Sequence, residues 1–504
     1  MNDSKPTPPA FDASLDDRDL RGRTVRGGTF TMVGQAVKFV LGIASLSILG
    51  RLLSPDEFGL VAMVLTLTSL ATRFKDFGLS LATVQRGEIN HDQISTLFWI
   101  NVAIGVAIAL TVSALAPAVA WFYQEPSLTL LTVAIATSFV MSGLTIQHQA
   151  LLQRSMRFGA LAIIQITAVT SGIVAAVIAA WFGAGVWALV LQILVQAFIM
   201  MLGTWSASRW MPGRFRRGAG VRGMLAFGGH LSASNLMVYI SRTLDNILIG
   251  RRWGDGPLGL YSKAYQLLLL PIQQINAPMS AVALPTLSRL QNDPKRFILY
   301  YERGLLFMTA IGMPAVVLLF VAADHAVLTV LGPQWTDAIE IFRLLAPAAL
   351  IGTFNVATTW VYISLGHTNR QLRWAIIATP VTCAAFVIGL PWGPTGVALA
   401  YSINVVVMRI PGILYCYQGT PIRLRHLINA LWMPALTSTI AGVAVWLVPD
   451  IPVNGLHVAW QFAADLLVFG AVYIVAWVTV PHGRRAIREL RELSRDLRPG
   501  ASKS

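Results

Sequence analysis

Charged and amide side chains stand inside long apolar segments of this chain. Gln35 and Lys38 lie on one face of a helix, because positions three residues apart share a side. Asn235, Arg242 and Asp245 share one face of a second helix in the same way. Lysine and arginine bind phosphate groups, so we expect Lys38 and Arg242 to face one cleft that takes a phosphate or pyrophosphate. A purely structural ion pair between Arg242 and Asp245 is the alternative for the second helix.

The two segments that contain these residues repeat one another. The first contains Gly28, Gly50, Arg51, Gly59 and Leu60, and the second contains Gly228, Gly250, Arg251, Gly259 and Leu260 at the same spacing. Lys38 aligns with Val238 in this repeat, whereas Arg242 aligns with Gly42. The two cations therefore lie on neighbouring turns rather than equivalent ones, and we expect the cleft to be asymmetric.

Other charged residues in apolar segments are weaker candidates. Lys263 and Arg343 lie near segment ends, where they either contact the ligand or extend toward water. The candidates for proton or sodium coupling are the carboxylates of Asp245, Glu340 and Asp465. Glu340 precedes Arg343 by one helical turn and could pair with it. Asp465 has no obvious partner in the sequence.

The composition identifies an integral membrane protein. Of the 504 residues, 55% are hydrophobic and 12% are charged, and the mean hydropathy is +0.63. A soluble domain carries about a quarter charged residues. The net charge of +15 would suit nucleic acid only on a soluble surface, so no nucleic-acid partner is expected. Cys383 and Cys416 form neither a metal-ligand pattern nor a disulfide framework, and we expect no metal and no cofactor.

Apolar runs of about 20 residues predict an all-α fold with about 14 transmembrane helices. The predicted spans are 29–49, 58–74, 94–120, 127–147, 158–181, 184–207, 224–250, 258–286, 304–323, 339–365, 372–391, 395–416, 427–448 and 459–480. Of the 38 lysine and arginine residues, 30 lie in the tails and in alternate loops, while the opposite loops hold only Arg51, Arg251 and Arg252. This asymmetry predicts that both chain ends are cytosolic. Arg409, near the inner end of its span, is expected to extend to the headgroups.

The repeat and the spans predict two six-helix bundles in parallel orientation, followed by two further helices. The expected parts are a cytosolic tail at 1–28, a first bundle at 29–208, a basic cytosolic linker at 209–223, a second bundle at 224–416, helices thirteen and fourteen within 427–480, and a basic cytosolic tail at 481–504. The longest outside loop is expected at 323–338.

Patterns typical of enzymes are weak in this sequence. Asp56 and Glu57 lie in the first outside loop, where a polytopic glycosyltransferase would place a catalytic carboxylate. The run from Ser54 to Glu57 is also a typical helix start, with a cap, a proline and acids in the first turn, and we favour that interpretation. No Walker-type loop occurs, and the histidines lack metal-ligand spacing. We therefore expect no enzymatic activity.

Several short motifs resemble one family of transporters. They are GRLLSPDEFG at 50–59, DFGL at 76–79, DNILIGR at 245–251 and LGLYSKAY at 258–265. In this order they resemble the polysaccharide-transporter family of Wzx-type oligosaccharide flippases, and the resemblance extends over about residues 21–480. That family belongs to the MOP (multidrug/oligosaccharidyl-lipid/polysaccharide) superfamily, together with the MATE exporters and the peptidoglycan lipid flippase. The exopolysaccharide branch is the most similar.

The resemblance implies translocation of an undecaprenyl-pyrophosphate-linked oligosaccharide across the bacterial inner membrane, for exopolysaccharide, lipopolysaccharide or capsule biosynthesis. Two lobes would alternate between inward-open and outward-open states, with cationic residues such as Lys38 and Arg242 at the pyrophosphate. The implied partners, besides the bilayer and this lipid, are polysaccharide polymerase and export proteins. Two alternatives stay open: a MATE-like antiporter of organic cations, which a positive cleft disfavours, and a polytopic transferase or ligase that uses Asp56 or Glu57.

Overall fold

The computed structural model of the chain describes residues 17–72, 83, 89–216, 243–448, 458–479 and 483. These residues are almost entirely helical, and no strand occurs among them. The chain divides into two compact units, residues 1–259 and residues 260–504. The expected all-α membrane fold is confirmed, while the assignment of six helices to each bundle stays a prediction.

Eleven stretches of the described residues are long and apolar enough to cross a membrane. One of them, Thr368–Tyr417, contains two helices that pack against each other, α13 (Thr368–Gly389) and α14 (Gly393–Tyr417). They have 22 and 25 residues, so this stretch accounts for two predicted spans. All predicted spans except the seventh coincide with a described helix, and the seventh, expected at 224–250, is described only from residue 243.

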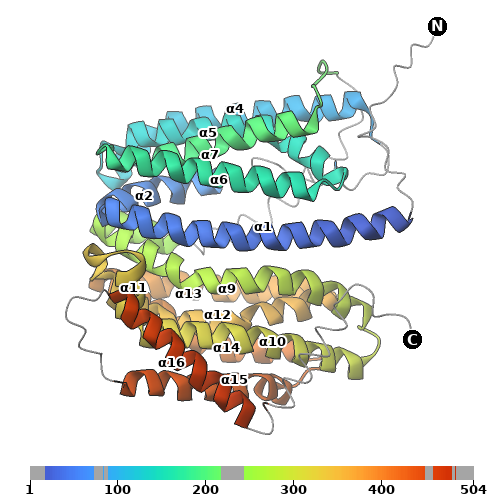
Figure 1. Ribbon diagram of the computed structural model, residues 1–504, viewed down its shortest axis with the longest axis vertical. Helices are drawn as coiled ribbons and strands as arrows, with labels where there is room; N and C mark the ends of the chain where they lie inside the picture. Colours follow the sequence, from blue (N-terminus) through green and yellow to red (C-terminus); the bar gives the residue numbers. More distant parts are fainter. Residues whose placement is uncertain are drawn as a thin grey trace. The chain divides into compact units, whose positions relative to one another are not determined.

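The first unit is built from helices that pack in pairs. They are α1 (Asp17–Leu52), α2 (Pro55–Thr72), α4 (His91–Tyr123), α5 (Leu128–Arg154), α6 (Phe158–Trp181) and α7 (Val186–Ser208). Helix α4 packs on α5 and α6 packs on α7, while a contact between α5 and α7 joins the two pairs. Helix α1 lies along α6 (Figure 1). Helix α1 is thereby brought together with three consecutive helices that lie much later in the sequence, α5, α6 and α7.

Two glycines allow α4 and α5 to approach closely. A Cβ atom on Gly105 would lie 2.6 Å from the carbonyl oxygen of Phe139, and one on Gly143 would lie 2.7 Å from that of Asn101. Small residues let helix backbones pack in a membrane, where lipid removes the hydrophobic force between helices. This close contact fixes the rotation of α5 and hence the direction of the side chains on its other faces.

The repeated glycines of the sequence meet in the first unit. A Cβ atom on Gly59 would lie 1.9 Å from the carbonyl oxygen of Asp255, and one on Gly259 would lie 1.9 Å from that of Pro55. Helix α9 (Asp255–Arg289) begins at this crossing. Each copy of the repeat therefore supplies the glycine that the backbone of the other copy requires.

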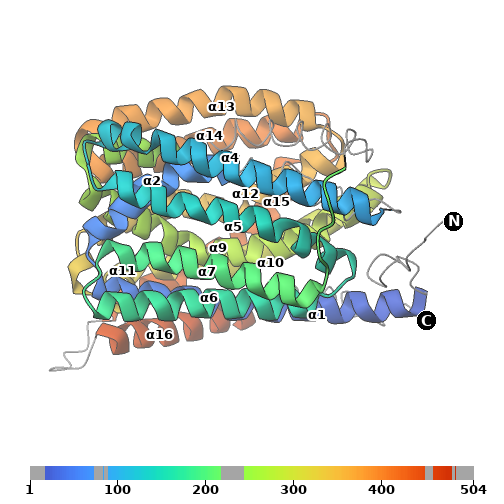
Figure 2. The same ribbon diagram turned by 90° about the horizontal axis from the view of Figure 1, so that it is seen from above.

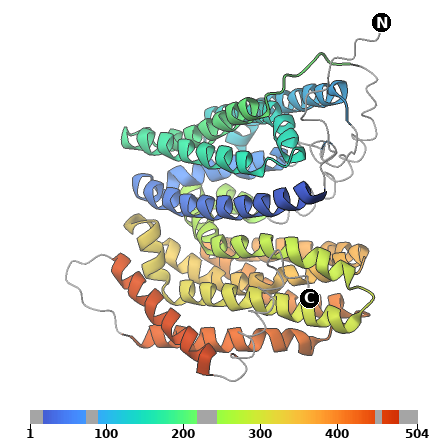
Figure 3. The same ribbon diagram turned by 45° about the vertical axis from the view of Figure 1, so that its right-hand side comes forward.

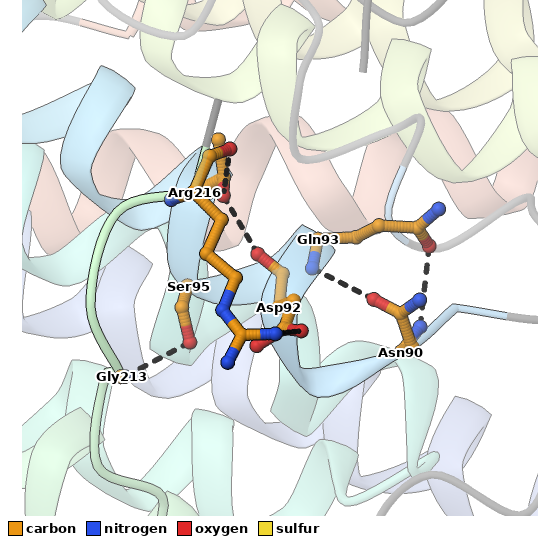
Figure 4. A network of polar contacts seen from close by, with 7 residues as sticks. Asn90, Asp92, Gln93, Ser95, Gly213 and Arg216 are labelled. Atoms are coloured by element: carbon orange, nitrogen blue, oxygen red, sulfur yellow. Dashed lines mark hydrogen bonds and ion pairs between the residues drawn. The ribbon is translucent and has the colours of Figure 1, made fainter. Parts of the chain in front are cut away.

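The described start of the predicted basic linker, residues 209–216, is fastened to the beginning of α4 (Figure 4). The amide of Gly213 donates to Ser95 Oγ at 2.9 Å, and the guanidinium of Arg216 lies 2.7 Å from a carboxylate oxygen of Asp92. Each of these contacts crosses more than a hundred residues of sequence. The first part of the linker therefore packs as a part of the first unit.

The second unit is organised around α12 (Ala338–Ser364), which packs on α10 and α14. Its other helices are α10 (Pro294–Val321), α11 (Ala323–Val330), α15 (Leu424–Leu447) and α16 (Val458–Thr479), together with most of α9 and with α13 and α14. Trp360 of α12 and Tyr301 of α10 are fully buried in one apolar cluster. Helices α13 and α14 lie side by side in Figure 2, and α16, in red, lies beside α15 in Figure 3.

The outside loop expected at 323–338 is largely folded. It contains α11 and a short 3-10 helix at Pro333–Trp335. The side chains of Ala326, Val327 and Trp335 are almost completely buried. Helix α11 packs on α12 and α16, and these tertiary contacts fold a segment that was expected only as a loop.

The glycine contact between α4 and α5 predicts a clear effect of a larger side chain. Gly143→Val is expected to lower the free energy of unfolding by about 1–3 kcal/mol, because the backbone of α4 leaves no room. Gly42→Val is the matched control, since a Cβ atom at Gly42 meets nothing within 4 Å. Thermal unfolding in detergent, followed by tryptophan fluorescence, measures both. Equal melting temperatures for the two variants would contradict the close crossing.

Candidate functional site

A cavity of about 670 Å³ lies within the first unit, between α1, α5, α6 and α7. Cavities that hold small ligands typically measure about 300–1,000 Å³. The polar residues that line it are Lys38, Ser138, Ser142, Thr145, Gln149, Gln153, Gln165 and Gln196. The remaining lining residues are apolar, and Phe139, Val169 and Met200 are among them. The cavity is therefore a polar compartment among apolar helices.

Lys38 is the cation of this cavity. Its ammonium nitrogen donates a hydrogen bond of 2.9 Å to Oε1 of Gln165 on α6. An ammonium group has three donors, so this bond leaves two of them for a ligand. No carboxylate is found among the described residues that line the cavity. The charge of Lys38 therefore meets a neutral amide there and stays available to an anion.

Helix α5 supplies most of the polar lining. Ser138, Ser142, Thr145, Gln149 and Gln153 follow one another at intervals of three or four residues, which a helix places on one side. The hydroxyls of Ser138 and Thr145 donate to carbonyl oxygens of their own helix, each at 2.7 Å, which leaves their lone pairs as acceptors. This stripe is not among the candidate residues predicted from the sequence, although its spacing is a signal that could have revealed it.

The other predicted residues of the repeated segments are only partly described. Gln35 is half-buried on α1 and is not part of the cavity lining. Asp245 is 5% exposed, and one of its carboxylate oxygens accepts a hydrogen bond of 2.8 Å from the amide of Asn246. Arg242 and Asn235 lie outside the described residues. The expected pairing of Lys38 with Arg242 in one cleft, and of Arg242 with Asp245, stays a prediction.

Two predicted cations of the second unit have partners in the structure. Lys263 Nζ donates to Oε1 of Gln266 at 2.9 Å, one turn along α9. The guanidinium of Arg343 forms an exposed ion pair with Asp324 in the first turn of α11. Glu340 is exposed in the first turn of α12. Arg343 thus fastens α12 to α11.

Asp465 has a partner after all. Its carboxylate lies 2.6 Å from Nδ1 of His325, with side-chain exposures of 17% and 19%. The contact joins α16 to α11, two helices that pack together although 140 residues separate the pair. The sequence offered no obvious partner for Asp465, because a contact between residues 140 positions apart leaves no trace in the local pattern.

Arg409 has a hydrogen-bond partner on another helix. Its Nη1 donates to the amide oxygen of Asn355 on α12. Its Nε is buried and has no hydrogen-bond partner within the described part of the chain. The expectation that Arg409 extends to the headgroups stays a prediction.

The acidic pair at the start of α2 acts as a helix cap. The amide of Ser54 donates to a carboxylate oxygen of Glu57 at 2.7 Å, and the amide of Glu57 donates to Ser54 Oγ at 3.3 Å. This reciprocal arrangement is a capping box, which satisfies backbone donors at a helix start. The favoured interpretation of these residues as a cap is confirmed, and the carboxylate of Glu57 is occupied by it.

The fold defines the class of protein. The solved structure of the lipid II flippase MurJ in its inward closed conformation is similar with a TM-score of 0.71, covering 90% of this chain and 98% of MurJ at 15% identity. At that identity the likeness concerns the fold alone. The chain is a multi-pass membrane protein with the fold of the MOP superfamily.

A family model described as "Polysaccharide biosynthesis protein" matches residues 48–340, and the chain belongs to this family of transporters and flippases. The lipopolysaccharide biosynthesis protein WzxC of Escherichia coli K12 is 25% identical over 421 residues, which is 82% of this chain and 85% of WzxC. The succinoglycan biosynthesis transport protein ExoT of Rhizobium meliloti 1021 is 25% identical over 503 residues, 96% of this chain and 98% of ExoT. The family expected from the sequence motifs is confirmed.

The pair of His325 and Asp465 predicts coupled stability effects. His325→Ala and Asp465→Asn should each lower the free energy of unfolding by about 1–3 kcal/mol, because each leaves a half-buried polar group without its partner. The double variant should lose clearly less than the sum of the two single losses. Chemical unfolding in detergent measures the free energies of unfolding of the wild type, the two single variants and the double variant. Additive losses would mean that the two side chains do not stabilise one another.

Proposed function

We propose that the protein translocates an oligosaccharide linked to undecaprenyl pyrophosphate across the bacterial inner membrane, with both chain ends on the cytoplasmic side. The observation that carries the proposal is the cavity in which Lys38 meets no carboxylate among the described lining residues. A polar headgroup needs such a compartment to cross hydrocarbon, because unsatisfied polar groups cost several kcal/mol there. Membership of a polysaccharide biosynthesis family supports the choice of cargo.

In the proposed mechanism Lys38 binds a phosphate oxygen of the lipid headgroup. A lysine ammonium forms charge-assisted hydrogen bonds to phosphate, and its two remaining donors can do so while Gln165 holds the side chain. The sugars follow the phosphate into the polar cavity, and the polyprenyl tail stays in the bilayer. Alternation of the two lobes between inward-open and outward-open states then exposes the headgroup to each side in turn.

The other predicted residues have supporting roles in this proposal. Arg242 serves as the second cation for pyrophosphate, and Asp245 orients it. Further contacts with the substrate are assigned to Gln35, Asn235, Lys263 and Arg343. The carboxylates of Asp245, Glu340 and Asp465 are the candidates for ion coupling, and Asp465 would act together with His325. Polysaccharide polymerase and export proteins are the proposed downstream partners.

Two rival functions fit the site less well. An antiporter of organic cations would require negative charge in the cavity, whereas the described lining holds one ammonium group and amides. A transferase acting through Glu57 would require a free carboxylate, but that side chain is bound to the backbone at Ser54. The headgroup of a lipid-linked oligosaccharide agrees with both the charge and the polarity of the cavity.

Reconstituted protein tests the role of Lys38. In proteoliposomes, Lys38→Ala is expected to slow the translocation of an undecaprenyl-pyrophosphate-linked oligosaccharide about tenfold or more, the loss of one charge-assisted hydrogen bond. Lys38→Arg should retain most of the rate, and Lys295→Ala, which removes an exposed lysine outside the cavity, should retain all of it. A wild-type rate for Lys38→Ala would remove this residue from the mechanism.

Depletion of the protein in cells tests which molecule it transports. When synthesis of the chain is stopped, the lipid-linked oligosaccharide should accumulate in the inner leaflet, because its synthesis continues while its export is blocked. Mass spectrometry of the extracted lipids identifies the species, and its accessibility to an added glycosidase reports the leaflet. Export of organic cations by the reconstituted protein, without any accumulation of lipid-linked sugar, would favour the antiporter instead.

A further inference from the structure

Three glutamines of the cavity have amides that form no hydrogen bond with the described residues of the protein. Gln149 and Gln153 on α5 and Gln196 on α7 line the cavity, and the described residues give their side chains no hydrogen-bond partner. A neighbouring glutamine, Gln192, differs in this respect, because its amide donates to Ser45 Oγ at 3.1 Å and it is not part of the lining. A polar group without a protein partner in a membrane segment needs water or a ligand.

The chemistry of these groups matches neutral hydroxyls. Each amide offers two donors and one acceptor, and the hydroxyls of Ser138 and Thr145 offer acceptors, since their protons go to their own helix. A sugar hydroxyl is at once a donor and an acceptor, so an amide can bind two neighbouring hydroxyls together. A carboxylate of an acidic sugar would instead require a second cation, and the described lining contains Lys38 alone.

The stripe is also long enough for more than one sugar. The lining residues of α5 run from Ser138 to Gln153, which at 1.5 Å per residue spans about 22 Å of helix. Hydroxyls occupy the middle turns of α5 and amides occupy its last turns, close to the end at Arg154. We call these residues of α5, together with Gln196 of α7, the polar wall of the cavity. Along α5 its side chains change from hydroxyls in the middle turns to amides in the last turns.

We infer that this wall binds uncharged, hydroxyl-rich sugar residues of the carried oligosaccharide, while Lys38 binds the phosphate. The inference rests on the proposed function and assigns the substrate class of the same cavity. The glutamines select for hydroxyls, and the described part of the lining holds no cation besides Lys38 that could pair with an acidic sugar. Specificity for the glycan thus comes from α5 and α7, and affinity for the lipid carrier comes from α1.

Binding to the purified full chain in nanodiscs tests the inference. The probes are undecaprenyl pyrophosphate, the same lipid bearing a glucose trisaccharide, the same lipid with glucuronate as its third sugar, and the free trisaccharide. The variant Gln149→Ala/Gln153→Ala/Gln196→Ala is compared with Gln192→Ala and Lys38→Ala. The triple variant is expected to lose about tenfold or more in affinity for the neutral glycolipid, and nothing for the sugar-free lipid, which also reports that it is folded.

The control variants separate the two parts of the site. Gln192→Ala should bind every probe like the wild type, and Lys38→Ala should lose affinity for all three lipids by a similar factor. The inference is overturned if the triple variant binds the neutral glycolipid like the wild type, or loses the sugar-free lipid equally. It is also overturned if the wild type prefers the glucuronate-bearing lipid by more than tenfold.

Failure of the proposed function gives a different result. If the wild-type protein binds the free trisaccharide, and the triple variant does not, but no polyprenyl lipid binds, the cavity is a sugar site and the flippase proposal fails. If the lipids bind and the triple variant changes nothing, the flippase proposal survives and the sugar wall fails.

Discussion

Hydrocarbon offers no hydrogen-bond partners, and this constraint accounts for the arrangement of polar groups in the described spans. Backbone groups are satisfied within helices, which is why apolar segments of this length are helical. Polar side chains find partners across helices: Lys38 with Gln165, Asp465 with His325, and Arg409 with Asn355. Each contact joins helices that are distant in sequence. The same contacts that lower the cost of a buried charge therefore also determine which helices lie together.

The cavity of the first unit departs from that arrangement. Its glutamines at 149, 153 and 196 line an open volume instead of pairing with other side chains. Gln149 and Gln153 are half-buried and Gln196 is exposed. Within membrane-spanning helices such amides need water or a ligand, so a protein that only had to be stable would carry apolar residues there. Their presence is explained when a polar headgroup occupies the cavity during part of the transport cycle. Membership of a polysaccharide biosynthesis family is consistent with the proposed passage of a sugar headgroup through this cavity.

Comparison of the two copies of the repeat distinguishes residues needed for packing, which are the same in both copies, from residues proposed to bind substrate, which differ. Gly59 and Gly259 are equivalent in both copies, since each touches a backbone carbonyl of the other copy at a distance that excludes any side chain. Lys38 has no equivalent lysine, because Val238 stands at the matching position. Backbone crossings are symmetric and therefore need the same residue twice. A substrate with a phosphate end and a sugar end is asymmetric, and the residues proposed to bind it differ between the copies.

The sequence by itself determined the membrane class, the spans, the family and the cation at Lys38, because apolar length, charge asymmetry and short motifs are local signals. The tertiary structure alone decided what surrounds that cation. The cavity combines α1, α5, α6 and α7, and the polar stripe on α5 became a wall only when α4 covered another face of the same helix. The partners of Asp465 and Arg409 were likewise hidden, since contacts between distant segments leave no periodic pattern. Local spacing shows which residues share a face, and only packing shows what that face meets.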